Sequence, residues 1–170
     1  MELDPEWTPR EGIREAPAFA PTSRPVTAGG QTFPTDLGKG RKILVIDDNA
    51  VVLKGFEFKL RSAGFEVFTS TEGSEAVKLA RSVRPDLVLV DINFPPGSGM
   101  HWDGFTILAW LHRQEGLEKV PIIVISSSEA EKYKRKSIES GALDFFQKPV
   151  VFPELLGRIR QILESPDPKS

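Results

Sequence analysis

The stretch VDINFPPGSGMHWDG, residues 90–104, decides how this sequence folds. Apolar β-forming residues at 87–90 run directly into a carboxylate, Asp91, and a Pro/Gly-rich loop then leads into a helical pattern. A buried strand that ends in an acid is costly, because an unpaired carboxylate loses hydration free energy when it leaves water. The sequence therefore predicts that another group binds Asp91, and the segments on either side indicate which one.

Strand patterns and helical patterns alternate outward from this stretch. Apolar strand patterns cover residues 42–47, 65–70, 86–91, 120–128 and 143–149, and helical patterns follow them at 50–65, 73–85, 103–114, 129–142 and 151–165. Strict alternation, with strands apolar on both faces, is typical of a parallel sheet covered by helices. We therefore expect an α/β fold: a doubly wound five-stranded parallel sheet, strand order 2-1-3-4-5, of the flavodoxin-like (βα)5 type. Ser74 is expected to cap the second helix.

Composition limits the classes to which the protein can belong. Its 170 residues include 22 Lys+Arg and 24 Asp+Glu, so the charge does not favour nucleic acid or an acidic membrane as partner. The absence of cysteine excludes a disulfide framework, a thiolate zinc site and a cysteine nucleophile. The sequence shows neither a secretory signal nor an apolar run of membrane-spanning length. These observations favour a soluble cytoplasmic protein.

Residues 1–40 differ in composition from the rest of the chain. They hold six of the 14 prolines and five of the 14 glycines and show neither a helical nor a strand period. Such a segment buries too little apolar surface to offset its ordering entropy. We therefore expect a disordered N-terminal extension at 1–40, one folded domain at 41–165 and a short tail at 166–170. The alternative is that Trp7, Phe19 and Phe33 make the extension a docking segment.

Polar side chains stand where four of the five predicted strands end. They are Asp47 and Asp48, Asp91, Ser126 and Ser127, and Lys148. Ligands of open α/β sheets bind beyond the carboxyl ends of the strands, at the switch in strand order. Three carboxylates gathered there repel one another by on the order of 4 kcal/mol per pair at about 4 Å, so the cluster needs a cation. Oxygen ligands without His or Cys suit Mg²⁺.

Asp91, Ser126 and Lys148 together indicate phosphoryl chemistry. Lys148 supplies a positive charge for an anion beside the metal, and Ser126 supplies a hydroxyl donor. Metal, ammonium and hydroxyl around one carboxylate suit a phosphoryl group in transit. Asp91 is then the candidate nucleophile, which forms an aspartyl-phosphate.

Five segments in order resemble the response-regulator receiver domain of bacterial two-component systems, of the single-domain type found in chemotaxis-type regulators: ILVIDDN, PDLVLVDINFP, DGF, PIIVISS and GALDFFQKP. The resemblance implies that Asp91 takes a phosphoryl group from a phosphohistidine on a sensor histidine kinase or a histidine phosphotransfer protein. It also implies that Mg²⁺ is held by Asp91, directly by Asp48, through water by Asp47, and by the backbone carbonyl of Asn93.

The resemblance further implies a conformational switch. Ser126 would bind the phosphoryl group and shift, and Phe145 would rotate after it. Lys148 would pair with the phosphoryl group, and the peptide bond between Lys148 and Pro149 would be cis. The fourth helix, fifth strand and fifth helix would then bind an unknown downstream protein, or the protein would relay the phosphate. We expect no output domain, and no enzymatic activity beyond the protein's own phosphorylation and dephosphorylation.

Some features leave alternatives open. The segment PGSGMHW, residues 96–102, lengthens the loop before Asp103 beyond the usual family pattern and borders the expected pocket. An Mg²⁺-dependent aspartyl-phosphate phosphatase, resembling the haloacid-dehalogenase class, would need an acid where Asn93 stands. A receiver-like scaffold that is never phosphorylated would not need the full set of charges. Locally, Asp47, Asp48 or Asn49 could simply cap a helix, Ser126 could cap the fourth helix, and Phe145 could be an immobile core ring.

Overall fold

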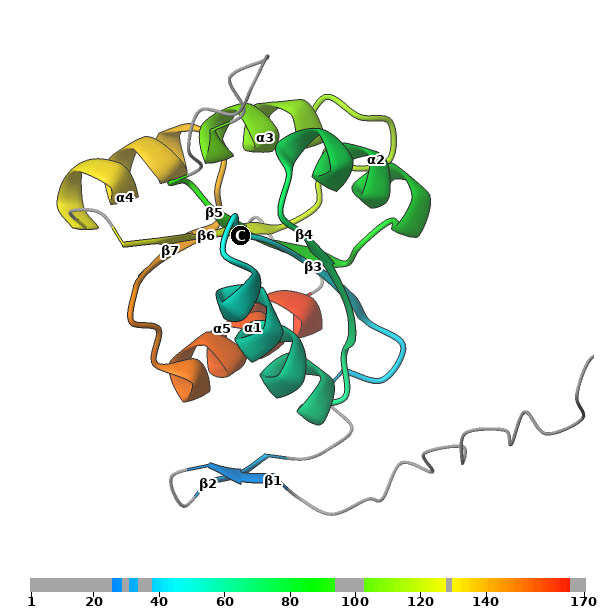
Figure 1. Cartoon of the computed structure of the whole chain (residues 1–170), viewed down its shortest axis with the longest axis vertical. Coiled ribbons are helices and arrows are strands. Elements are labelled where there is room, and N and C mark those ends of the chain that lie inside the picture. The colour runs from blue at the N-terminus through cyan, green and yellow to red at the C-terminus, as the bar shows by residue number, and fades with distance from the viewer. Residues whose placement is uncertain (1–25, 29–30, 34–37, 94–102, 128–129, 166–170) are drawn as a thin grey trace, which may run out of the picture.

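A parallel sheet forms the centre of the protein (Figure 1). The computed structural model describes residues 26–28, 31–33, 38–93, 103–127 and 130–165. The sheet strands are β3 (Lys42–Ile46), β4 (Glu66–Ser70), β5 (Leu87–Asp91), β6 (Ile122–Ser126) and β7 (Asp144–Gln147). Their order is β4-β3-β5-β6-β7, which is 2-1-3-4-5 when these strands alone are counted. The predicted sheet and strand order are confirmed.

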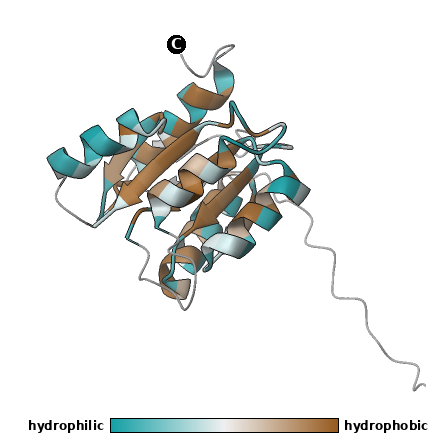
Figure 2. Cartoon of the chain, turned by 90° about the horizontal axis from the view of Figure 1, so that it is seen from above, coloured by the Kyte–Doolittle hydropathy of each residue, from teal (hydrophilic) through white to brown (hydrophobic). Residues whose placement is uncertain are grey.

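Helices cover both faces of the sheet. They are α1 (Ala50–Ser62), α2 (Gly73–Val83), α3 (Gly104–Leu111), α4 (Ala130–Glu139) and α5 (Phe152–Glu164). Helices α1 and α5 lie on one face, and α2, α3 and α4 lie on the other (Figure 1). Figure 2 shows strands that are almost wholly hydrophobic between helices that carry both residue classes. The doubly wound arrangement follows from these two layers.

Alternate residues of each strand enter two separate cores. In β3, Ile43 and Val45 pack with α1 and α5, whereas Leu44 and Ile46 pack with α2 and α3. Strands β5 and β6 are buried at every position, which explains their continuous apolar sequences. Because the interior strands are covered on both faces, polar side chains are concentrated at the strand ends.

The helix starts settle two expectations from the sequence. Asn49 caps α1, since its side chain accepts hydrogen bonds from the N–H groups of Val51 and Val52. Asp47 and Asp48 are therefore not needed as caps. The expectation that Ser74 caps α2 was wrong, because the helix already begins at Gly73. The Ser70 hydroxyl bonds both backbone polar groups of Glu72, which fixes the turn just before that start.

A small hairpin lies outside the main sheet. Strand β1 (Val26–Ala28) pairs antiparallel with β2 (Gln31–Phe33), with Val26 opposite Phe33. It falls in the stretch 1–40, where the sequence indicated no regular element, and the division at residues 40 and 165 stays a prediction. Within the part of the chain that the structure describes, every helix falls short of the length or apolarity that a membrane crossing demands.

Candidate functional site

The carboxyl ends of four parallel strands bring the polar residues of the sequence together. Ile46 at the end of β3 is level with Val90 of β5, so Asp47 and Asp91 extend from adjacent strands. In the next pairs, Asp91 is opposite Ile125, and Ser126 is opposite Gln147, the residue before Lys148. The register of the sheet alone therefore places these side chains at one edge, at the switch in strand order.

Lys148 lies between two buried carboxylates. Its Nζ donates to Oδ2 of Asp47 and to Oδ2 of Asp91, at 2.6 Å in each case. Asp47 and Asp91 are 3% and 4% exposed, whereas the Lys148 side chain is 21% exposed and reaches the pocket from its rim. The sequence predicted Lys148 only as a positive charge for an anion beside the metal. The structure shows it against both acids, because one ammonium offsets the repulsion between two carboxylates.

The backbone around Lys148 supports this position. The Lys148 N–H donates to the Ser126 carbonyl over 2.8 Å, which continues the pairing of β6 with β7 one residue further. The peptide bond between Lys148 and Pro149 is cis, as the resemblance implied. Lys148, whose ammonium neutralises Asp91, therefore comes directly after β7, the strand that pairs with β6 and Ser126.

The pKa values in the pocket reflect burial and charge together. Burial raises the pKa of the Asp47 carboxyl above its ordinary value, with the charge of Asp91 adding to the effect, although Lys148 and the Asn49 N–H act against it. Burial alone would lower the pKa of the Lys148 ammonium, but its hydrogen bonds to both acids outweigh burial and raise it. The ammonium therefore stays protonated at neutral pH.

Three carboxylates could hold a cation at this edge. One oxygen each of Asp47, Asp48 and Asp91 lies within 4.8 Å of the others. Asp48 is exposed, so it borders the solvent side of the buried pair. The remaining oxygens of the two buried acids are occupied: Oδ1 of Asp47 accepts from the Asn49 N–H, and Oδ1 of Asp91 accepts from the Asn93 N–H. These bonds fix both carboxylate planes. A set of oxygen donors without His or Cys suits a hard divalent ion such as Mg²⁺.

The side chain of Asn93 connects the acid strand to the next strand. Its Nδ2 lies 3.2 Å from Oγ of Ser126 and 2.8 Å from Oγ of Ser127. The sequence assigned Asn93 only a backbone role and assigned Ser127 none. The repeated serines at the end of the strand were the only signal of these hydrogen bonds in the sequence. Spacing alone does not show which serine hydroxyl the Asn93 amide reaches.

Ser126 and Phe145 occupy different environments. Ser126 is fully buried at the end of β6, next to the acid pocket, and α4 begins only at Ala130, so Ser126 does not stand at the start of that helix. Phe145 lies in β7 opposite Val124 and is 9% exposed within the core that α2 and α3 cover. The structure therefore brings Ser126 to the acids and keeps Phe145 as a core ring in this state.

Gly104 connects the first turn of α3 to the acid strand. A Cβ atom at this residue would lie 2.5 Å from the backbone oxygen of Asp91 and 2.5 Å from Cα of Ile92. Asp103 caps the same helix, since its Oδ1 accepts from the Thr106 N–H over 2.7 Å. The close approach requires glycine. The inserted residues 96–102 before this turn lie outside the described residues.

Comparisons with known proteins agree with this geometry. The chain matches the family model of the response regulator receiver domain over residues 43–160. It is 35% identical over 122 residues to the transcriptional regulatory protein PrrA of Mycobacterium leprae, which covers 72% of this chain and 49% of that protein. The chain thus spans about half the length of this curated relative.

Two further proteins match over nearly their whole length. The polar-differentiation response regulator DivK of Brucella anthropi is 27% identical over 72% of this chain and 96% of its own. The solved structure of the chemotaxis protein CheY4 of Vibrio cholerae has a TM-score of 0.65 and 26% identity, and covers 71% of this chain and 97% of its own. The acid pocket thus lies at the end of a sheet whose fold this chain shares with solved response-regulator structures.

Proposed function

The chain belongs to the response regulator receiver domain family, and on that premise we propose that Asp91 is the phosphoacceptor of a signalling switch. The phosphoryl donor is a phosphohistidine on a sensor histidine kinase or a histidine phosphotransfer protein. The phosphorylated form then changes partner binding or passes the phosphate on. One observation supports the proposal most strongly: a buried carboxylate at the end of β5 lies 2.6 Å from an ammonium and beside further acids.

The chemistry that we propose forms one bond and breaks another. An oxygen of Asp91 attacks phosphorus, the P–N bond to the donor imidazole breaks, and the imidazole keeps the electron pair and takes up a proton. The product is an acyl phosphate on Asp91. Lys148 is already within hydrogen-bond distance of Oδ2 of Asp91, so its charge is in place to balance the phosphoryl oxygens.

The acid cluster fits Mg²⁺ by its donor chemistry. Asp47, Asp48 and Asp91 would hold the ion, with the backbone carbonyl of Asn93, and the four bring oxygen ligands only. When bound, such an ion offsets the negative charge on the transferring phosphoryl oxygens. The protein's own part is to hold the two buried acids in fixed planes, through the N–H groups of Asn49 and Asn93.

The switch that we propose begins at Ser126. Its hydroxyl accepts from Asn93 in this structure, and donation to a phosphoryl oxygen on Asp91 would require the hydroxyl to reorient and shift. Phosphorylation also adds about −1.5 to −2 units of charge beside Lys148. Because Ser126 pairs with Gln147 on β7, a shift there reaches Phe145 two residues earlier on the same strand. The surface of α4, β7 and α5 would report the change to a partner.

We propose that the chemistry is confined to the protein's own phosphate. A phosphatase that acts through an aspartyl-phosphate needs a general acid beside the nucleophile. The residue two positions after Asp91 is Asn93, and its amide donates to Ser127. Multiple turnover of a generic phosphate ester, abolished by Asp91→Asn, would overturn this part of the proposal and leave the acceptor role of Asp91 intact.

Intact-mass measurement tests the acceptor role. The full chain is incubated with Mg²⁺ and acetyl phosphate, and we expect one phosphate adduct that neither Asp91→Asn nor a chelated sample forms. Asp86→Asn is the matched control, because Asp86 lies just before the opposite end of β5, where it accepts from the Lys42 N–H. An adduct that persists in Asp91→Asn, or that forms equally with chelator, would contradict the proposal.

A further inference from the structure

Helix α1 carries a stripe of uncharged residues on one side, in which two large apolar side chains are exposed. Val51 and Phe58 are 80% and 75% exposed. Gly55 and Ser62 complete a row at spacings of three and four residues, so the four residues lie on one side of the helix. At Gly55 a Cβ would meet nothing within 4 Å, so the row is open to a neighbour. The exposed Phe58 ring and Val51, with an open glycine between them, indicate a contact surface.

A groove continues this stripe toward the acid pocket. It has a volume of about 230 Å³ and is lined by Val52, Gly55, Phe56, Lys59, Lys148, Pro149, Val150 and Phe152. Gly55 belongs to both the stripe and the groove. The Lys59 ammonium lies 5.2 Å from the centre of the Phe152 ring, so the rim of the groove is cationic above an apolar floor. We call the stripe and this groove together the α1 surface.

The charges of the α1 surface and of the N-terminal segment are opposite. Helix α1 carries Lys54, Lys59 and Arg61 against one acid, Glu57, which pairs with Lys54 and Arg61, so the side chains of the helix keep a net charge of +2. Residues 1–15 contain five acidic and two basic side chains, a net charge of −3. The same residues include Trp7 and Ile13, which are apolar groups of the size that a groove and an exposed phenylalanine stripe can hold.

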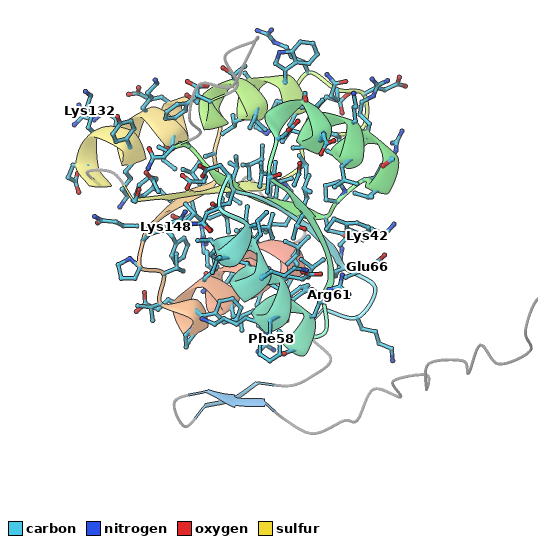
Figure 3. The ribbon with its side chains drawn as sticks, viewed as in Figure 1. Lys42, Phe58, Arg61, Glu66, Lys132 and Lys148 are labelled. Atoms are coloured by element: carbon cyan, nitrogen blue, oxygen red, sulfur yellow. The ribbon has the colours of Figure 1, made fainter. Side chains whose placement is uncertain are left out.

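The chain enters the folded domain beside this surface. Gly38 packs against Gly64 and Phe65, which directly follow α1: a Cβ on Gly38 would lie 2.4 Å from the Phe65 nitrogen. Figure 3 shows Phe58 at the outer edge of the domain, on the side of the β1–β2 hairpin. The length of α1 is only about 20 Å at 1.5 Å per residue. A segment tethered at one end of the helix therefore reaches the other end, at an effective concentration in the millimolar range.

We propose that residues 1–25 of this chain dock on the α1 surface, with acidic side chains against Lys54 and Lys59 and apolar side chains along Phe58 and the groove. Docking itself does not depend on the phosphoacceptor role proposed above.

A single spin label tests the proposal in the full chain. The sequence contains no cysteine, so Thr8→Cys carries one nitroxide label next to Trp7. We expect loss of amide NMR peak intensity at Gly55, Phe58 and Lys59 of α1, with α4 on the opposite face of the sheet unaffected. An undocked chain of this length would spread over about 30 Å and would also weaken peaks near its tether at the end of α1, so the variants below are needed to assign the loss to docking.

Two variants separate docking from proximity. Lys54→Glu with Lys59→Glu reverses the charge of the helix, and Phe58→Ser removes the aromatic ring. All three residues are exposed, so the fold is kept. We expect both variants to restore the α1 peaks, whereas Lys132→Glu on α4 leaves the loss unchanged (Figure 3). Intensity loss centred on α4, or loss that survives both α1 variants, would overturn the proposal. Loss between separately labelled chains in a mixed sample would instead assign the surface to a second copy, and would also overturn it.

Discussion

The Nζ of Lys148 bridges Oδ2 of Asp91 and Oδ2 of Asp47, at 2.6 Å from each. Two buried acids from neighbouring strands thus share one cation that arrives from a third strand, β7. The bridge explains how the pocket keeps its acids together, because each carboxylate has lost water that the ammonium replaces in part. Much of the behaviour of the site follows from this contact.

Lys148→Ala should destabilise the protein. The change leaves two buried carboxylates without their cation. We expect a loss of about 1–3 kcal/mol in the free energy of unfolding, which is smaller than the loss for breaking a fully buried ion pair because Lys148 is partly exposed. Urea unfolding measures it, with exposed Lys132→Ala as control. Adding Asp47→Asn to the variant should recover stability by removing the repulsion. Equal stability of Lys148→Ala and wild type would show that the bridge contributes nothing.

Gly104→Ala should disturb the acid strand. The new Cβ would meet backbone atoms of Asp91 and Ile92 at 2.5 Å, so α3 must shift. We expect a loss of about 1–3 kcal/mol in unfolding free energy and slower phosphorylation. Gly55→Ala on α1 is the matched control: it meets nothing within 4 Å, and it should stabilise the helix by up to about 1 kcal/mol. Similar effects of the two substitutions would contradict the assigned contact.

Ser126→Ala should separate phosphorylation from the switch. The variant keeps Asp91 and Lys148, so we expect a phosphate adduct, but the NMR signals of Phe145 should no longer respond to it. Ser127→Ala is the control. The Ser127 hydroxyl bonds Asn93 but is not part of the pairing of Ser126 with Gln147 that connects β6 to the strand of Phe145, so the Phe145 signals should still respond to phosphorylation. If Phe145 responds equally in both variants, the ring does not follow Ser126.

The sequence predicted the sheet and the gathering of its polar residues, but not the partners within the site. Continuous apolar runs indicate strands that are covered on both faces, and register then places Asp47, Asp91 and Lys148 at one edge. Side-chain pairing depends on rotamers and on distances across strands. For that reason the contact between Lys148 and Asp47, and the bond from Asn93 to Ser127, could not be read from spacing. The helix start at Gly73 agrees with the predicted pattern, but Ser74 was wrongly assigned as the cap, because the Ser70 hydroxyl, three residues upstream of Gly73, organises the turn before the helix.

Glu57→Gln should give a small, pH-dependent loss. Glu57 pairs with Lys54 at 2.9 Å and with Arg61 at 3.1 Å, and the hydrogen bond from Lys54 lowers the pKa of its carboxyl. A lowered pKa in the fold adds stability that is present above the unfolded pKa and disappears as the pH falls through the lowered value. We expect about 0.3–0.5 kcal/mol per pair at neutral pH, measured by urea unfolding. A difference that persists in acid or in high salt would contradict this origin.

Locating the phosphate tests the central claim most directly. The full chain is phosphorylated with acetyl phosphate and Mg²⁺, and borohydride then reduces the acyl phosphate to an alcohol, so that the modified aspartate becomes homoserine. Peptide mass spectrometry identifies the position. We predict homoserine at position 91 alone, and none without the phosphate donor. Homoserine at position 47 or 48, or an unmodified Asp91 in a sample that carries the phosphate adduct, would contradict the account.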